Sequence, residues 1–152
     1  MMFMVRKATV DDMEKYFEWV NDKNVRVNSF QSNQISLNNH IHWFNRKLND
    51  EGSYLYVIEK SSVMLGQVRF DVLGKEATID YSIDQEHRGL GLSKDLIKLA
   101  IFQFNMASTN INRIIAKVKI SNLVSESVLI SSIFKLEDNN IDNAFKTYIY
   151  SL

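Results

Sequence analysis

The chain has 152 residues, of which 45% are hydrophobic and 11% aromatic, so it can bury a core of single-domain size and is not expected to be disordered. Its 18 Lys and Arg residues balance its 18 Asp and Glu residues, which argues against a broad positively charged surface for nucleic-acid binding. It has no cysteine, which excludes disulfides, thiolate metal sites and thiol nucleophiles.

Metal and membrane sites are not expected either. The three histidines, His40, His42 and His87, do not have the spacing of a zinc motif. Residues 1–5 are apolar but too short for a signal peptide, and no apolar stretch approaches the roughly 18 residues of a membrane span. We therefore expect a cytoplasmic protein without metal, membrane or nucleic-acid partners. No linker or repeat divides residues 1–152, which are expected to form one domain.

The first half of the chain has the pattern of one strand, two helices and three further strands. Thr9, with Asp12 three residues on, resembles a helix N-cap and its acidic partner. The polar run at 21–24 is expected to end that helix, and Ser36 is a second candidate N-cap. The expected elements are a strand at 3–8, helices at 9–20 and 37–48, and strands at 54–59, 63–72 and 76–83.

The second half alternates helices with strands. A helix is expected at 93–106, a strand at 113–120, a helix at 122–134 and a final strand at 147–152. The resulting order, β-α-α-β-β-β-α-β-α-β, indicates an α/β domain with a mixed sheet. The apolar helix at 93–106 and the final strand could join a homodimer, although core packing explains the helix equally well.

The most informative stretch is the turn Arg88-Gly89-Leu90-Gly91-Leu92, which stands between a predicted strand and a predicted helix. Its glycines let a ligand approach the backbone closely, and the helix that follows directs free N–H groups at it. Such a turn suits a pyrophosphate, although an ordinary tight connection explains two glycines equally well. No Gly-Lys-Ser/Thr follows, which excludes a P-loop, and a third glycine is missing from a dinucleotide fingerprint.

The stretch at 77–100 resembles motif A of the GNAT acetyltransferases, whose pattern Arg/Gln-x-x-Gly-x-Gly/Ala follows the fourth strand. Here Ser93 takes the place of the last Gly/Ala, and it is still small. Residues 118–125 resemble motif B of the same family, a strand followed by Asn-x-x-Ser. The element order matches as well. The resemblance therefore covers nearly the whole chain and implies a single GNAT-type domain with a mixed, mostly antiparallel central sheet flanked by helices.

This resemblance implies direct transfer of an acetyl group from acetyl-CoA, as co-substrate, to a primary amine. The fold would contribute mainly proximity and orientation, while a base removes a proton from the ammonium. Backbone N–H groups of the glycine turn would hold the pyrophosphate, and the motif B residues would lie near the pantetheine arm. The residues so assigned to acetyl-CoA are Ile83, Arg88, Gly89, Leu90, Gly91, Leu92, Ser93, Asn122 and Ser125.

The catalytic groups depart from the family pattern. Many GNAT enzymes place a tyrosine seven residues after the motif B Asn, as the acid for the departing thiolate, and Leu129 stands there instead. Ser131 or Ser132 could serve, the thiolate could leave unaided because a thiol pKa is near 8.5, or activity could be lost. Asp80 and Tyr81 are the candidate bases. Adjacent strand residues face opposite sides, and the sequence does not tell which one faces the cleft.

The N-terminal third resembles, more loosely, GNAT enzymes that acetylate nucleotide-linked amino sugars, notably UDP-4-amino-sugar N-acetyltransferases of the pseudaminic acid pathway. In those enzymes an Asn-Asp…Val-Arg segment precedes an Ile-Ser…His…Trp-Phe helix, as at 21–26 and 35–44 here. Arg26 would then pair with a diphosphate, and His40 or Trp43 would stack on uracil or sugar. The substrate-binding set is Arg26, Phe30, His40 and Trp43, although structural roles for Arg26, His40 and Trp43 explain the pattern too.

Two alternatives to an amino-sugar enzyme remain open. A ribosomal-protein-like N-terminal acetyltransferase shares much of the pattern but needs a groove for an extended peptide. A non-catalytic module that keeps acetyl-CoA as a ligand is favoured by the missing tyrosine at Leu129. The cation and the aromatic rings in the N-terminal third favour a UDP-linked amino sugar as the small-molecule partner in surface polysaccharide biosynthesis.

Overall fold

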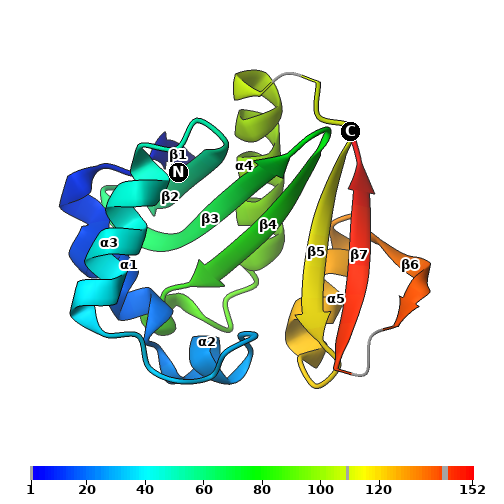
Figure 1. The fold of residues 1–152 in the computed structure, drawn as a ribbon, viewed down its shortest axis with the longest axis horizontal. Helices are drawn as coiled ribbons and strands as arrows, with labels where there is room; N and C mark the ends of the chain where they lie inside the picture. Colours follow the sequence, from blue (N-terminus) through cyan, green and yellow to red (C-terminus); the bar gives the residue numbers. More distant parts are fainter. Residues whose placement is uncertain (1, 109, 142–143) are drawn as a thin grey trace.

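The computed structural model of this protein describes residues 2–108, 110–141 and 144–152, with the side chains of 138–141 left out. The strands are β1 (Phe3–Lys7), β2 (Ser53–Lys60), β3 (Val63–Leu73), β4 (Glu76–Ile83), β5 (Arg113–Lys119), β6 (Lys135–Ile141) and β7 (Phe145–Ser151). They form one sheet in the order β1-β2-β3-β4-β5-β7-β6 (Figure 1). The pair β4 and β5 is parallel and the other neighbours are antiparallel, which agrees with the predicted mixed, mostly antiparallel sheet.

Helices cover both faces of the sheet (Figure 1). They are α1 (Met13–Val20), α2 (Lys23–Val27), α3 (Leu37–Leu48), α4 (Ser93–Ala107) and α5 (Leu123–Ser131), with short 3-10 turns at Val10–Asp12 and Gln85–His87. In the described part of the chain no helix is both long and apolar enough to cross a membrane.

Every predicted helix and strand is present, within a few residues of its expected ends, and two further elements were missed. The short helix α2 forms because Asp22, expected to belong to a break, caps a new helix by accepting from the N–H groups of Asn24 (3.0 Å) and Val25 (3.3 Å). The polar strand β6 shows no apolar alternation and forms by pairing with β7 at the edge of the sheet. The predicted helix at 122–134 ends at Ser131, and Ile133 then adopts a positive φ of 70°.

The predicted N-terminal cap is confirmed and also anchors the helix to the sheet. Thr9 and Asp12 form a capping box at the 3-10 turn that leads into α1. The guanidinium of Arg6, on β1, holds the Asp12 carboxylate through two hydrogen bonds of 2.7 and 2.8 Å and also donates to Glu59 on β2. The hydrogen bond from Arg6 lowers the pKa of Asp12 against the opposing effect of burial, so the pair stays charged.

The sheet separates two apolar cores. The smaller core lies under α1 and α3 and includes Tyr16, Trp19 and Phe44. The larger core lies under α4 and α5, where Phe70 of β3 stacks on Phe104 of α4 with ring centroids 4.2 Å apart and planes 7° apart. Both rings are fully buried, so this stack ties α4 to the centre of the sheet.

The position of α4 depends on this stack. We expect Phe104→Ala to lower the free energy of unfolding by about 3–5 kcal/mol, because it leaves a cavity where no solvent can enter. Phe102→Ala is the matched control, since Phe102 lies on the same helix but is 65% exposed and should change stability by less than about 0.5 kcal/mol. Urea denaturation followed by circular dichroism measures both, and equal losses would contradict the assignment.

Candidate active site

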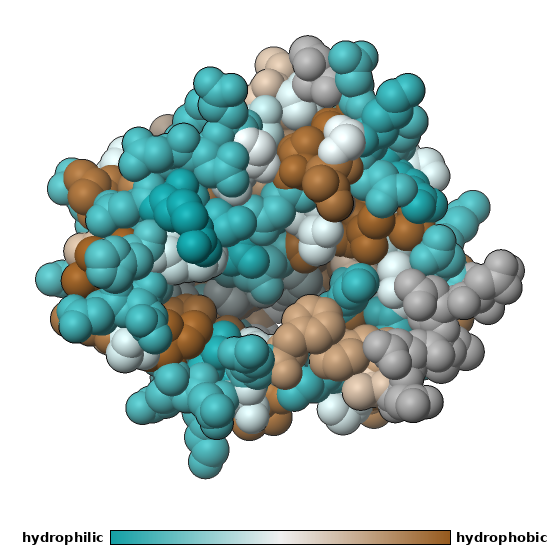
Figure 2. Space-filling model, in the orientation of Figure 1, coloured by the Kyte–Doolittle hydropathy of each residue, from teal (hydrophilic) through white to brown (hydrophobic). Residues whose placement is uncertain are grey.

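A cleft of about 270 Å³ opens where β4 and β5 separate. The two strands pair only between Glu76–Thr78 and Arg113–Ile115, and beyond these residues they diverge (Figure 1). The edges of both strands therefore face the cleft without a strand partner, as an extended ligand would require. Figure 2 shows this face as mostly hydrophilic, hollowed between the two halves of the sheet. The walls come from residues 79–83, 87–89, 91–93 and 116–118, from one side of α5 with its N-cap, and from α2 with the two residues that follow it.

The glycine turn forms one end of the cleft. Gly89 and Gly91 have φ angles of 75° and 72°, which L side chains rarely adopt, and a Cβ at either position would meet no atom within 4 Å. Helix α4 follows directly, and Leu92 at its N-cap provides no side-chain hydrogen bond. The N–H groups of its first turn are thus available to an anion, which the helix dipole also attracts. This open cradle fits a pyrophosphate.

Arg88 is held in place beside the turn rather than left free. Its Nε donates to the carbonyl of Ile83 at 3.0 Å, and its Nη2 lies 3.0 Å from the carboxylate of Asp22, the N-cap of α2. The side chain therefore links the end of β4 to α2. The side chain of Leu90 is 65% exposed and does not line the cleft, so its predicted contact with acetyl-CoA would have to come from the backbone N–H and stays a prediction.

A buried carboxylate just before the turn ties it to α1. Asp84 Oδ1 accepts from Trp19 Nε1 at 2.7 Å and pairs with Lys15 Nζ at 3.1 Å, while its Oδ2 lies 3.1 Å from His87 Nδ1. Burial raises the pKa of Asp84, but the hydrogen bonds from Trp19, Lys15 and His87 outweigh it and lower that pKa to about 2. No local sequence pattern indicates this anchor, because Trp19 and Asp84 lie 65 positions apart along the chain.

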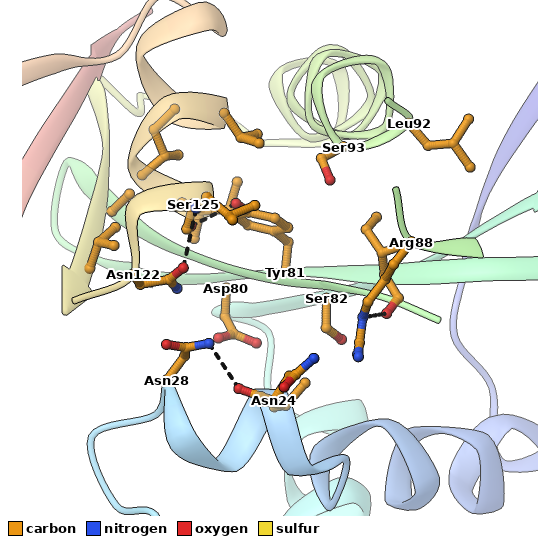
Figure 3. A pocket seen from close by; sticks show the side chains of 18 of the residues that line it. Asn24, Asn28, Asp80, Tyr81, Ser82, Arg88, Leu92, Ser93, Asn122 and Ser125 are labelled. Carbon is orange, nitrogen blue, oxygen red and sulfur yellow. Dashed lines mark hydrogen bonds between the residues drawn. The ribbon is translucent and has the colours of Figure 1, made fainter. Parts of the chain in front are cut away.

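The two candidate bases lie on opposite sides of the sheet (Figure 3). Asp80 points toward α2, where the amides of Asn24 and Asn28 lie, and accepts from Gln67 Nε2 at 3.1 Å. Tyr81 points toward α5, where its hydroxyl lies 2.7 Å from the hydroxyl of Ser125. Both residues line the cleft, because the separation of β4 from β5 opens it to both faces.

These two residues differ in burial, which sets the protonation state of Tyr81. Burial raises the pKa of Tyr81 to about 12, and the hydrogen bond with Ser125 offsets only part of that effect. Its phenol is therefore neutral near pH 7 and cannot act as a base there. The side chain of Asp80 is 54% exposed on the α2 side, and its carboxylate lies 3.9 Å from Arg69 Nη1.

The wall on the α5 side is mainly apolar. Leu129 is fully buried at the position where the family tyrosine was expected. Ser131 and Ser132, the substitutes considered, both donate their hydroxyls to the carbonyl of Val128 and do not line the cleft. The residues assigned to acetyl-CoA that do line it are Ile83, Arg88, Gly89, Gly91, Leu92, Ser93, Asn122 and Ser125.

None of the four predicted acceptor residues lines the cleft. His40 is 1% exposed, contacts the rings of Trp43 and Phe44, and bonds through Nε2 to the carbonyl of Met13. Burial lowers its pKa, so it is a neutral core histidine rather than a ligand for a sugar. Trp43 packs under the guanidinium of Arg69, 5.0 Å from its centre. Their prediction as substrate-binding residues therefore needs correction.

Arg26 and Phe30 shape the loop after α2. The guanidinium of Arg26 donates to the carbonyls of Val20 (2.6 Å) and Gln31 (2.9 Å) and to Ser29 Oγ (3.1 Å), so it stabilises this loop instead of facing a diphosphate. Phe30 stacks on Phe145 of β7, with ring centroids 4.2 Å apart, which brings the loop across the cleft to the other half of the sheet. The polar residues that do face the cleft here, missed from the sequence, are Asn24, Asn28, Ser29, Ser82 and Lys117.

Comparison with known proteins identifies this architecture. Residues 3–134 match the family model described as the acetyltransferase (GNAT) domain. The spermidine N-acetyltransferase from Vibrio cholerae, solved with CoA and spermine, is similar at 18% identity and a TM-score of 0.84, over 98% of this chain and 95% of that one. A domain from Methanocaldococcus jannaschii is similar at 16% identity and a TM-score of 0.82, over 99% of both chains. No curated protein sequence matches this chain.

The glycine turn should be required for binding acetyl-CoA. We expect Gly91→Val to weaken that binding at least tenfold, because a side chain at this φ strains the loop and enters the cradle. Gly74→Val is the matched control, since Gly74 also has a positive φ, of 64°, and open space around it, but lies in the turn between β3 and β4. Isothermal titration calorimetry measures both dissociation constants. Equal affinity in the Gly91 variant and the unchanged protein would rule out this cradle.

Proposed function

The chain belongs to the GNAT family of acetyltransferases, and on that premise we propose that it acetylates a small primary amine that also carries hydroxyl and anionic groups. As a member of this family it is an N-acetyltransferase that takes the acetyl group from acetyl-CoA. Our specific candidate for the acceptor is the amino group of a nucleotide-linked amino sugar. The observation that carries this choice is the set of polar side chains on the α2 side of the cleft.

The residues present fit acetyl-CoA, which supplies a thioester carbonyl for an amine to attack. The open cradle at Gly89 and Gly91 and the uncapped start of α4 suit its diphosphate. Leu129, Val118 and Val128 offer an apolar wall to its arm, at the side where Asn122 caps α5 by accepting from the N–H of Ser125 at 3.2 Å. These residues would bind and orient the donor, which is the main contribution to a direct transfer.

Asp80 is suited to receive the acceptor amine. It is the one carboxylate among the described residues that line the cleft, and Gln67 fixes its orientation through the 3.1 Å hydrogen bond. A carboxylate here attracts an ammonium and can take up the proton that the amine must lose before it attacks. Behind it, Gln67 Oε1 is buried and accepts no hydrogen bond within the described residues. A buried oxygen without a donor costs about 1–3 kcal/mol, and a water would satisfy it.

The surrounding groups favour a hydroxylated acceptor with an anionic part over a polyamine. Asn24, Asn28 and Ser29 offer amides and a hydroxyl to neutral polar groups. Lys117 of β5 also lines the cleft. It lies on the strand face that carries Lys119, whose ammonium donates to the carbonyl of Val27, the last residue of α2. A cation at this place attracts a phosphate or carboxylate and repels a polycation. Spermine is bound by the Vibrio cholerae protein, but a cleft lined by a single carboxylate and a lysine suits a polycation poorly.

The acceptor class is tested by release of free CoA from acetyl-CoA with a panel of amines. The panel holds a UDP-linked 4-amino-4,6-dideoxy sugar, free glucosamine, spermidine and a peptide with a free N-terminus. We expect selective turnover of the sugar nucleotide, and Asp80→Asn should lower its kcat/KM about 100-fold through loss of the base. Asp11→Asn, a change at an exposed residue outside the cleft, should leave it unaltered. Turnover of spermidine alone would overturn the acceptor class, and no turnover with any amine would favour the non-catalytic module.

Lys117 should distinguish acceptors by their charge. We expect Lys117→Gln to raise the KM for the sugar nucleotide about tenfold, because an attraction to its diphosphate is lost, and to leave the KM for glucosamine unchanged. Lys98→Gln on the exposed surface of α4 is the control for the change of net charge. The effect should shrink at high salt, since screening weakens the interaction in the unchanged protein. An equal rise in KM for both acceptors would show that Lys117 does not recognise an anion.

A further inference from the structure

The α5 side of the cleft carries a pair of hydroxyls within a mainly apolar wall. Tyr81 from β4 and Ser125 from α5 lie 44 positions apart in sequence, and their hydroxyl oxygens are 2.7 Å apart. Both line the cleft (Figure 3), and the apolar Val128 and Leu129 line it too. This hydrogen bond joins β4 to α5 and fixes the direction of the phenol.

We propose that the Tyr81 hydroxyl, oriented by Ser125, donates a hydrogen bond to the sulfur that leaves during acetyl transfer. This inference rests on the proposed function, because it assigns the thiol side of the same cleft. Asp80 then serves the amine on one face of the sheet, and Tyr81 serves the sulfur on the other. The role that a tyrosine at Leu129 would fill is thus taken over by a residue from β4.

The transfer balances without a further reactant. The neutral amine forms a bond to the carbonyl carbon, the carbon–sulfur bond breaks, and its electron pair stays on sulfur as a thiolate. The nitrogen loses one proton before attack and one afterwards, and Asp80 can pass these to solvent. The thiolate receives a hydrogen bond from Tyr81 and leaves as an anion or takes a proton from solvent.

The magnitudes decide between a hydrogen bond and a full proton transfer. Burial raises the pKa of Tyr81 to about 12, whereas a thiol has a pKa of about 8.5. Moving the proton from the phenol to the thiolate would therefore be unfavourable by roughly a thousandfold. A phenol that keeps its proton still stabilises the developing negative charge, because the hydrogen bond with Ser125 already fixes its direction.

The other candidate groups are in the wrong place or already committed. The Ser131 and Ser132 hydroxyls donate to the carbonyl of Val128, and Leu129 has no donor. Asp80 lies on the opposite face and carries a negative charge that would repel a thiolate (Figure 3). Ser125 can donate to the Tyr81 oxygen, which leaves the phenol proton free for the sulfur.

The first test needs no acceptor. The thiol pKa of bound CoA is measured from the ultraviolet absorbance of its thiolate during a pH titration of the saturated complex. Tyr81→Phe should raise this pKa by about one unit relative to the unchanged protein, because a hydrogen bond to the anion is lost. Ser125→Ala should raise it by less, while Tyr150→Phe, a change outside the cleft, should leave it unaltered. Identical thiol pKa values in the Tyr81 variant and the unchanged protein would overturn the inference.

A second readout separates this inference from the choice of acceptor. With an amine that the unchanged protein acetylates, Tyr81→Phe should lower kcat about 100-fold and leave the dissociation constant of acetyl-CoA within about twofold. A purely structural tyrosine would instead weaken binding or stability. Failure of every acceptor would count against the proposed function while the thiol titration still decides the role of Tyr81. Full kcat in the Tyr81 variant would refute that role alone.

Discussion

Strands β4 and β5 run parallel and share only three residue pairs before they separate. Beyond that point both strands expose backbone groups that no neighbouring strand satisfies, within a sheet whose other described neighbours are antiparallel. The two halves of the molecule are joined around the opening by α5 on one side and by the α2 loop on the other, through the contact of Phe30 with Phe145. The result is a passage across the sheet, and the chemistry of the site depends on it.

Such a passage gives two adjacent residues of one strand separate tasks. Alternation along β4 directs Asp80 and Tyr81 to opposite faces, and in a closed sheet they could not meet the same ligand. Because the neighbouring strand has moved away, both reach the cleft from their own side. The Asp80 carboxylate and the neutral Tyr81 phenol are kept apart by the backbone. This arrangement suits acetyl transfer, because the amine loses protons while the sulfur gains negative charge. The buried Asp84 joins α1 to the segment before the glycine turn through Trp19 and Lys15, and so fixes the position of that segment.

What the sequence predicted correctly depends on local signals. The cap at Thr9 and Asp12, the periodicity of α3 and the glycine turn are each contained within a few residues, and the structure has them. The errors arise where distant contacts decide. Arg26 is a residue type that often binds anions, but its guanidinium donates to neighbouring carbonyls instead. His40 is covered by aromatic rings from α1 and α3. The hydroxyl pair of Tyr81 and Ser125 exists only because β4 and α5 meet in space.

The most direct test of the central claim is a crystal structure of the protein with bound CoA. We expect diphosphate oxygens within hydrogen-bond distance of the N–H groups at residues 89–93, and the sulfur inside the opening between β4 and β5, on the Tyr81 side. A diphosphate bound away from the glycine turn, or a thiol arm that stays outside that opening, would contradict it.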